Sequence, residues 1–107
     1  MARPRPFRIV YAPVVYEHLR VIPRKPHGLI KGAIEVHLGG EPDSESTRRK
    51  LLSPTTEFDA EWELRSGPKN MYRVFYNIDA TLRIVLIVAI GVKRGNRLKI
   101  GRDEVML

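Results

Sequence analysis

The spacing of apolar residues in the first third of the chain predicts one strand followed by two helices. Phe7, Ile9 and Tyr11 alternate with Arg8 and Val10, and this period of two is typical of a strand with one buried face. Pro13 then suits the first turn of a helix. Apolar residues recur at helical spacing over residues 14–22 and again over residues 27–38. The pair of glycines that follows the second run indicates a helix end.

The second half of the chain predicts antiparallel strands. Apolar and polar residues alternate over residues 61–65, as expected of a strand. Residues 71–78 indicate a neighbouring strand, with Tyr72, Val74, Tyr76 and Ile78 on one face and Arg73, Phe75 and Asn77 on the other. Residues 82–92 are apolar on both faces, which indicates a central strand covered at least in part on both sides. A short last strand is expected within residues 98–107. Residues 41–60 are polar and predict a long loop, and loops of this length are often functional.

These elements predict an α+β domain in which two N-terminal helices pack on a four- or five-stranded, mainly antiparallel sheet. The length of 107 residues fits a single domain over residues 1–107. A domain this small buries only about two-thirds of the surface of its unfolded chain. We therefore expect a functional site to be a shallow surface on the sheet or a loop.

The charge of the chain points to an anionic partner. The formal net charge is +7, and such an excess favours nucleic acid, an anionic membrane surface or an acidic protein. Residues 80–102 contain no acidic residue, and a stretch of one sign is expected of a phosphate-binding surface. A solvated basic surface without a ligand is the alternative. The basic residues of this stretch are Arg83, Lys93, Arg94, Arg97, Lys99 and Arg102.

Several classes of protein are disfavoured by what the sequence lacks. There is no cysteine, so disulfides and cysteine-based zinc sites are excluded. The three histidines show no metal-ligand spacing, and no cofactor-binding motif is present. Residues 84–92, the longest apolar run, are too few to span a bilayer, and residues 1–7 do not resemble a signal peptide. We therefore expect a cytoplasmic protein without metal, cofactor or membrane partner.

Three segments of the chain carry a family resemblance through their order and spacing. Trp-Glu-Leu-Arg at residues 62–65 precedes Tyr-Arg-Val-Phe-Tyr-Asn-Ile-Asp at residues 72–79. Ile-Gly-Val-Lys at residues 90–93 is followed by Gly-Asn-Arg-Leu at residues 95–98, and a basic Arg-Arg-Lys-Leu motif occupies residues 48–51. Together these motifs resemble the RelE/ParE superfamily of toxins from type II toxin–antitoxin systems.

The resemblance implies a function and partners. Toxins of this superfamily are neutralised by a cognate antitoxin protein that wraps around them. One branch consists of endoribonucleases, or mRNA interferases, that inhibit translation by cleaving mRNA, commonly on the ribosome. The other branch poisons DNA gyrase without cleaving RNA. We expect this chain to be a toxin, with ribosome-dependent mRNA cleavage as the leading activity.

The motif positions give candidate site residues. Four are candidate catalytic groups: Arg65, Arg73, Lys93 and Arg97. Five more are expected to bind RNA: Arg48, Arg49, Lys50, Arg94 and Lys99. Arginine suits the phosphate because its planar fork meets two oxygens at once, and Arg73 carries over as the phosphate-binding arginine of the Tyr-Arg-Val motif. The alternative is an exposed Arg73 paired with Glu61 or Glu63, worth ~0–1 kcal/mol. We expect Arg65, Arg73 and residues 93–99 to share one cationic surface.

The sequence departs from the ribonuclease pattern at two positions. Glu61 and Glu63 stand where that pattern has lysines, four and two residues before Arg65, and carboxylates there would repel a phosphate. Either other groups, such as Arg49 and Lys50, act as acid and base, or the chain is not this kind of nuclease. A non-enzymatic gyrase poison and a non-catalytic basic RNA-binding module therefore remain alternatives.

Overall fold

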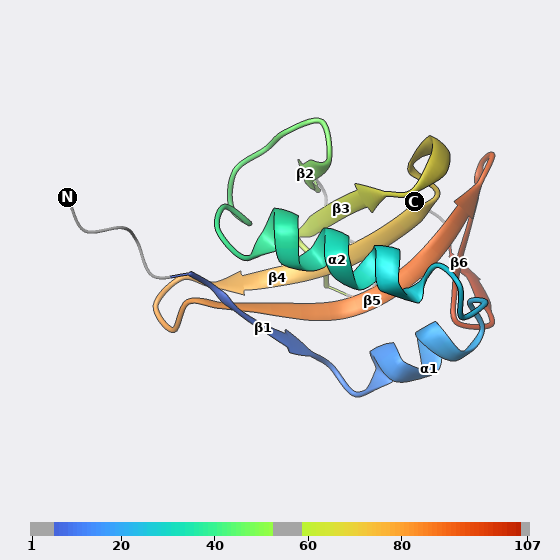
Figure 1. The fold of residues 1–107 in the computed structure, drawn as a ribbon, viewed down its shortest axis with the longest axis horizontal. Helices are drawn as coiled ribbons and strands as arrows, with labels where there is room; N and C mark the ends of the chain where they lie inside the picture. The colour runs from blue at the N-terminus through green and yellow to red at the C-terminus, as the bar shows by residue number, and fades with distance from the viewer. Residues whose placement is uncertain (1–5, 53–58, 106–107) are drawn as a thin grey trace.

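A computed structural model describes residues 6–52 and 59–105, which form a sheet with two helices lying across one face (Figure 1). The sheet has seven strands in the order β2-β3-β4-β5-β6-β7, and β1 pairs with β5 outside this path. The β1–β5 pair is parallel and the other pairs are antiparallel. The elements are β1 (Arg8–Tyr11), α1 (Val14–Arg20), α2 (His27–Leu38), β2 (Arg49–Leu51), β3 (Trp62–Ser66), the 3-10 helix η1 (Pro68–Asn70), β4 (Tyr72–Asp79), β5 (Ile84–Arg94), β6 (Arg97–Ile100) and β7 (Asp103–Val105).

The predicted architecture of two N-terminal helices on a four- or five-stranded sheet is wrong, because the sheet has seven strands. Part of the expected loop forms the edge strand β2, which begins where the Ser46 hydroxyl accepts hydrogen bonds from the backbone N–H groups of Arg48 and Arg49. Residues 84–105 form the three strands β5, β6 and β7, because the chain reverses at Gly95 and again at Gly101, both with positive φ. A polar strand of three residues is too short to give an alternating signal.

The main core lies between the helices and one face of the sheet. Apolar residues at helical spacing on α1 and α2 face inward, and alternate residues of β3, β4 and β5 meet them. Each fully buried aliphatic side chain contributes roughly 1.5–3 kcal/mol. The buried residues of this core include Val15, Leu19, Ile30, Ile34, Leu38, Leu64, Val74, Tyr76, Ile87 and Ile90.

Tyr76 connects this core to the segment between α2 and β2. Its ring is fully buried and stacks on Trp62, with centroids 6.0 Å apart. Its hydroxyl donates a hydrogen bond to the carbonyl oxygen of Pro42 at 2.7 Å. The segment that leads from α2 to β2 is therefore held against the sheet, and burial raises the pKa of Tyr76.

The opposite face of the sheet carries a smaller apolar cluster beside a polar one. Phe75 and Ala89 pair in register and pack with Leu98 and Ile100 of β6. A bulge between Phe75 and Tyr76 shifts the pairing by one residue, so β5 presents buried residues on both faces, as its sequence predicts. Glu63, Arg65 and Arg73 occupy the remainder of this face, because they alternate with the core residues of β3 and β4.

Candidate functional site

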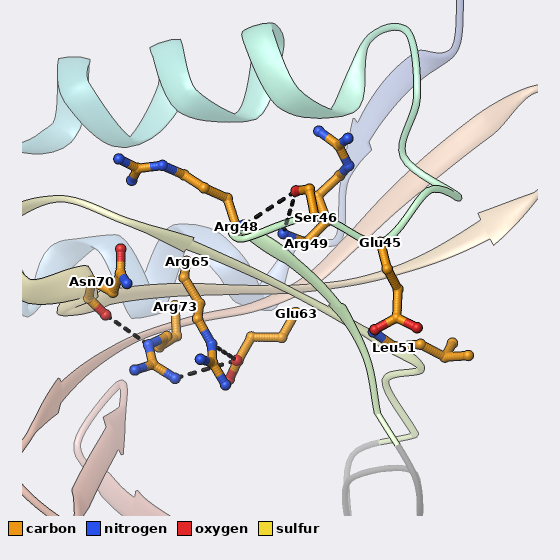
Figure 2. Close-up of polar contacts among 9 residues, drawn as sticks. All are labelled: Glu45, Ser46, Arg48, Arg49, Leu51, Glu63, Arg65, Asn70 and Arg73. Carbon is orange, nitrogen blue, oxygen red and sulfur yellow. Dashed lines mark hydrogen bonds and ion pairs between the residues drawn. The ribbon is translucent and has the colours of Figure 1, made fainter.

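Two arginines meet at one carboxylate on the face of the sheet opposite the helices (Figure 2). Arg65 of β3 and Arg73 of β4 are direct register partners. The Arg65 Nε donates a hydrogen bond to the Glu63 Oε1 at 2.7 Å, and the Arg73 Nη1 donates to the same oxygen at 3.2 Å. We call Glu63, Arg65 and Arg73 the Glu63 trio.

Burial and ion pairing hold the three side chains of the trio in place. Glu63 is 1% exposed and Arg73 is 6% exposed. Cations directly opposite one another on neighbouring strands repel, and a buried carboxylate is costly without a partner. Glu63 lies two residues before Arg65 on the same face and accepts hydrogen bonds from both guanidinium groups. The carboxylate therefore offsets the repulsion between the arginines, and the arginines compensate the burial of the carboxylate. The expected repulsion between Glu63 and a phosphate is therefore countered by two adjacent cations.

Arg73 is also fixed by the turn before its own strand. Its Nε donates a hydrogen bond to the carbonyl oxygen of Asn70 at 2.7 Å (Figure 2). Lys69 and Asn70 both have positive φ, 54° in each case. Such backbone conformations cost about 1–3 kcal/mol and cluster at functional sites. The sequence alternative paired an exposed Arg73 with Glu61 or Glu63. The pairing with Glu63 is confirmed, whereas the expected exposure is wrong, because this side chain is buried and held at two of its nitrogens.

A hollow of about 430 Å³ opens beside Arg73. It is bounded by η1 and by the turn between β5 and β6. The backbone N–H of Lys93 donates a hydrogen bond to the carbonyl oxygen of Met71 at 2.7 Å, which joins the two sides. We call it the Arg73 hollow; its lining residues are Pro68, Lys69, Met71, Arg73, Lys93, Arg94 and Gly95.

The expected single cationic surface does not form, because the β5–β6 hairpin divides its residues between two faces. Lys93 pairs with Leu98, whereas Lys99 pairs with Val92, which packs against the helix-side core. Register partners share a face and neighbouring residues alternate. Arg97 and Lys99 therefore lie on the helix side, while Lys93 lies on the side of the trio.

The basic motif at residues 48–51 is also divided between the two faces of the sheet. Lys50 pairs in register with Glu63 and so shares the face of the trio. Arg49 instead donates hydrogen bonds to the carbonyl oxygens of Ser44 at 2.7 Å and His37 at 3.3 Å, and so ties β2 to the end of α2. Figure 2 shows the Arg48 side chain pointing away from Glu63. Of the three residues, Lys50 is the one placed on the face of the trio.

A second hollow, of about 590 Å³, lies on the helix side between the end of α1 and the strands β5 to β7. Its apolar floor includes Ile22 and Ile90, which are 5% and 1% exposed. We call it the His18 hollow; its lining residues are His18, Val21, Ile22, Pro23, Ile90, Val92, Arg94, Arg97, Lys99, Gly101, Arg102 and Glu104. Arg94 lines both hollows.

His18 has a defined orientation in the second hollow. The backbone N–H of Ile90 donates a hydrogen bond to the His18 Nδ1 at 3.3 Å, so the neutral ring carries its proton on Nε2. Burial lowers the pKa of His18, and the carboxylates of Asp103 and Glu17 oppose that shift. Sequence reasoning did not select His18, because a lone histidine within a helical pattern carries no signal for the strand that it meets.

Sequence reasoning also missed Lys69. The Gly67-Pro68 pair indicates a turn, but nothing in the pattern shows that this turn faces Lys93 across a hollow. Within residues 6–52 and 59–105, no group of three or more histidine, aspartate or glutamate side chains is arranged to hold a metal ion. No helix in the same residues is long and apolar enough to cross a membrane.

No known protein family, curated protein or solved structure matches this chain.

Proposed function

We propose that this chain is the toxin of a type II toxin–antitoxin pair of the RelE/ParE kind, which inhibits translation in the cytoplasm by cleaving mRNA on the ribosome. The observation that carries the proposal is the Glu63 trio beside a hollow lined by Lys69 and Lys93. The seven-stranded sheet does not contribute to the proposal. Its support comes from the order of the motifs and from the side chains at the Arg73 hollow.

The trio suits the stabilisation of a phosphate during RNA cleavage. In this reaction the 2′-hydroxyl attacks the phosphate, and extra negative charge develops on the phosphate oxygens. Arginine meets such oxygens with two parallel N–H groups. Two hydrogen bonds already fix the guanidinium of Arg73, so little side-chain freedom is lost on binding. One such preorganised donor is worth roughly 3 kcal/mol in the transition state.

The cleavage step moves two protons: the 2′-hydroxyl loses one and the leaving 5′-oxygen gains one. Lys93 lines the hollow together with Arg73, and we assign it the donation of a proton to the leaving oxygen. The proton of the 2′-hydroxyl passes to a water molecule in the open hollow. Arg97 and Lys99 lie on the other face, so neither belongs to this catalytic set.

The proposal is tested with purified protein, ribosomes and a translated mRNA whose 5′ ends are mapped by sequencing. We expect new 5′ ends within the reading frame for the unaltered chain and none for Lys93→Ala or Arg65→Ala. The matched control is Lys31→Ala, which removes one charge from an exposed position on α2. Intact 5′ ends with the unaltered chain would contradict the proposed activity.

The two sequence alternatives make different predictions for cells that express the chain. Glu61 and Glu63 in place of lysines favour a gyrase poison, which would produce double-strand DNA breaks and an SOS response while translation continues. A non-catalytic RNA-binding module would bind RNA in a salt-sensitive way and leave growth unchanged. Measuring translation and DNA breaks in the same culture separates all three functions.

A cognate antitoxin is part of the proposal. The net charge of +7 favours a partner with an acidic or amphipathic segment. Co-expression with a short neighbouring reading frame should restore growth. Growth arrest that persists with each neighbouring frame would contradict this part of the proposal.

A further inference from the structure

The His18 hollow combines an apolar floor with a cationic rim. Ile22 and Ile90 form part of the floor, and the exposed Val21 extends it at the end of α1. The rim carries four exposed cations from β5, β6 and the turn that follows: Arg94, Arg97, Lys99 and Arg102. Among the described residues, Glu104 is the one acidic residue of the lining, and its Oε1 lies 3.9 Å from the Arg97 Nε.

From this combination we propose that the His18 hollow binds a peptide segment of a partner protein that carries both aliphatic and acidic side chains. The aliphatic side chains would cover Val21, Ile90 and their neighbours, and the carboxylates would meet the rim. The Glu63 trio lies on the opposite face of the sheet, so the peptide would bind away from it, and Arg94 lines both hollows.

The distribution of charge favours a peptide over a small anion. The rim cations belong to three segments, β5, β6 and the turn before β7. A ligand with several separated carboxylates can meet such a rim, whereas one phosphate or carboxylate can reach only part of it. The volume of about 590 Å³ is within the range of sites that bury a ligand of several groups.

The lining also favours a peptide over nucleic acid. Proteins that bind single-stranded RNA usually offer aromatic rings on which the bases stack. Among the described residues, no tyrosine, tryptophan or phenylalanine lines the hollow, and its floor is aliphatic. The one aromatic ring in this lining is His18, whose Nδ1 accepts a hydrogen bond from the backbone N–H of Ile90. Aliphatic side chains in a groove with complementary charges at its rim are typical of peptide recognition.

The sheet edge next to the hollow supports the same kind of partner. β7 pairs with β6 on one side and ends the strand order of the described residues. A free edge offers backbone N–H and C=O groups to an added segment. Glu104 belongs both to this strand and to the lining of the hollow, so one bound segment can contact both.

The test begins with selection of a displayed library of random peptides on the full chain, followed by fluorescence anisotropy of an enriched peptide. We expect enriched peptides to contain leucine, isoleucine or valine together with aspartate or glutamate. Arg102→Glu and Val21→Asn should each weaken binding by about tenfold, equivalent to about 1.4 kcal/mol. Replacing the aliphatic residues of the peptide by serine should weaken binding to a similar extent.

Two control variants separate the hollow from the general charge and hydrophobicity of the chain. Lys31→Glu makes the same kind of charge reversal on exposed α2, and Val36→Asn alters a valine that is 76% exposed. Both should bind the peptide as the unaltered chain does. Equal affinity of all four variants would overturn the proposal, as would a failure of any peptide to be enriched.

A single-stranded RNA oligonucleotide serves as the competing probe. Its affinity should not change with Val21→Asn. If RNA binding falls with Val21→Asn and Arg102→Glu while peptide binding does not, the hollow belongs to a nucleic-acid surface and the peptide site is refuted.

Discussion

At the scale of single residues, Glu63 determines how the two arginines lie. Its one oxygen accepts hydrogen bonds from both Arg65 and Arg73, and these two side chains would otherwise face each other as like charges. The Glu63 carboxylate is buried, so both arginine partners are needed to compensate the cost of removing its charge from water. Removing a single partner from a buried ion pair is far more destabilising than replacing the pair together.

Arg73→Met should therefore lower the free energy of unfolding by about 3 kcal/mol, because it leaves a buried charge with one partner fewer. The double variant Glu63→Leu with Arg73→Met should recover most of that loss. Urea denaturation of the two variants measures the difference. A double variant no more stable than the single one would show that the buried carboxylate is not the source of the loss.

Lys93→Ala should weaken RNA binding without changing stability. Its amine lines the Arg73 hollow, and each phosphate contact with single-stranded nucleic acid adds ~0.7 to the slope of log affinity against log salt concentration. Anisotropy titrations at several salt concentrations should show that slope reduced by about this amount. Lys31→Ala is the control, and an unaltered slope for Lys93→Ala would place this lysine outside the RNA contact.

At the scale of elements, the close pairing of β5 with β6 depends on Gly91. A Cβ atom at this position would lie 2.6 Å from the Lys99 carbonyl oxygen and 2.9 Å from the Ile100 Cγ1. The first of these atoms is backbone and can move away only if the strands separate. The hairpin that divides the cationic residues between two faces therefore requires a glycine here.

Gly91→Ala should lower the free energy of unfolding by about 1–3 kcal/mol because of this overlap. Gly32→Ala in α2 is the matched control, since a Cβ there meets nothing within 4 Å. It should raise stability by about 0.5–1 kcal/mol through the higher helix propensity of alanine. Thermal or urea denaturation checks both signs, and a Gly91→Ala variant as stable as the unaltered chain would contradict the close approach.

The elements with a strong hydrophobic pattern can be predicted from the sequence, and those without one cannot. The helix over residues 27–38 has a strong helical periodicity and β5 has a long continuous apolar run, and the structure confirms both elements. The strand β2 has three residues and pairs over a polar segment, so no periodicity identifies it. The expected face of Arg97 and Lys99 depended on the register of the β5–β6 hairpin, and a shift of one residue moves every side chain to the other face.

At the scale of the whole molecule, the two hollows give the chain two cationic sites of different chemistry. The Arg73 hollow lies beside a buried ion cluster on one face, and the His18 hollow has an aliphatic floor on the other. Arg94 lines both hollows. The cations that the sequence predicted to form a single surface thus lie at two hollows.

The stability of the whole chain should decrease as the pH falls below about 6.5, the ordinary pKa of histidine. Burial lowers the pKa of His18, and burial together with the nearby Arg49 and Arg48 lowers that of His37. The unfolded chain then binds protons more readily than the folded chain, so these groups stabilise the fold above their unfolded pKa and that contribution is lost on acidification.

His18→Gln should make the free energy of unfolding less dependent on pH between about 5 and 7, where histidine titrates. Urea denaturation at a series of pH values compares this variant with the unaltered chain. Identical pH profiles would mean that His18 has the same proton affinity in the folded and unfolded states.

The RNA site is tested most directly by a nuclear magnetic resonance titration of the ¹⁵N-labelled chain with a short RNA whose 2′-hydroxyls are methylated to prevent cleavage. We predict that the largest shifts of backbone amide signals fall on Lys69, Met71, Arg73 and Lys93, around the Arg73 hollow. Shifts confined to the His18 hollow, or no shifts at saturating RNA, would contradict the assignment of the Glu63 trio to phosphate binding.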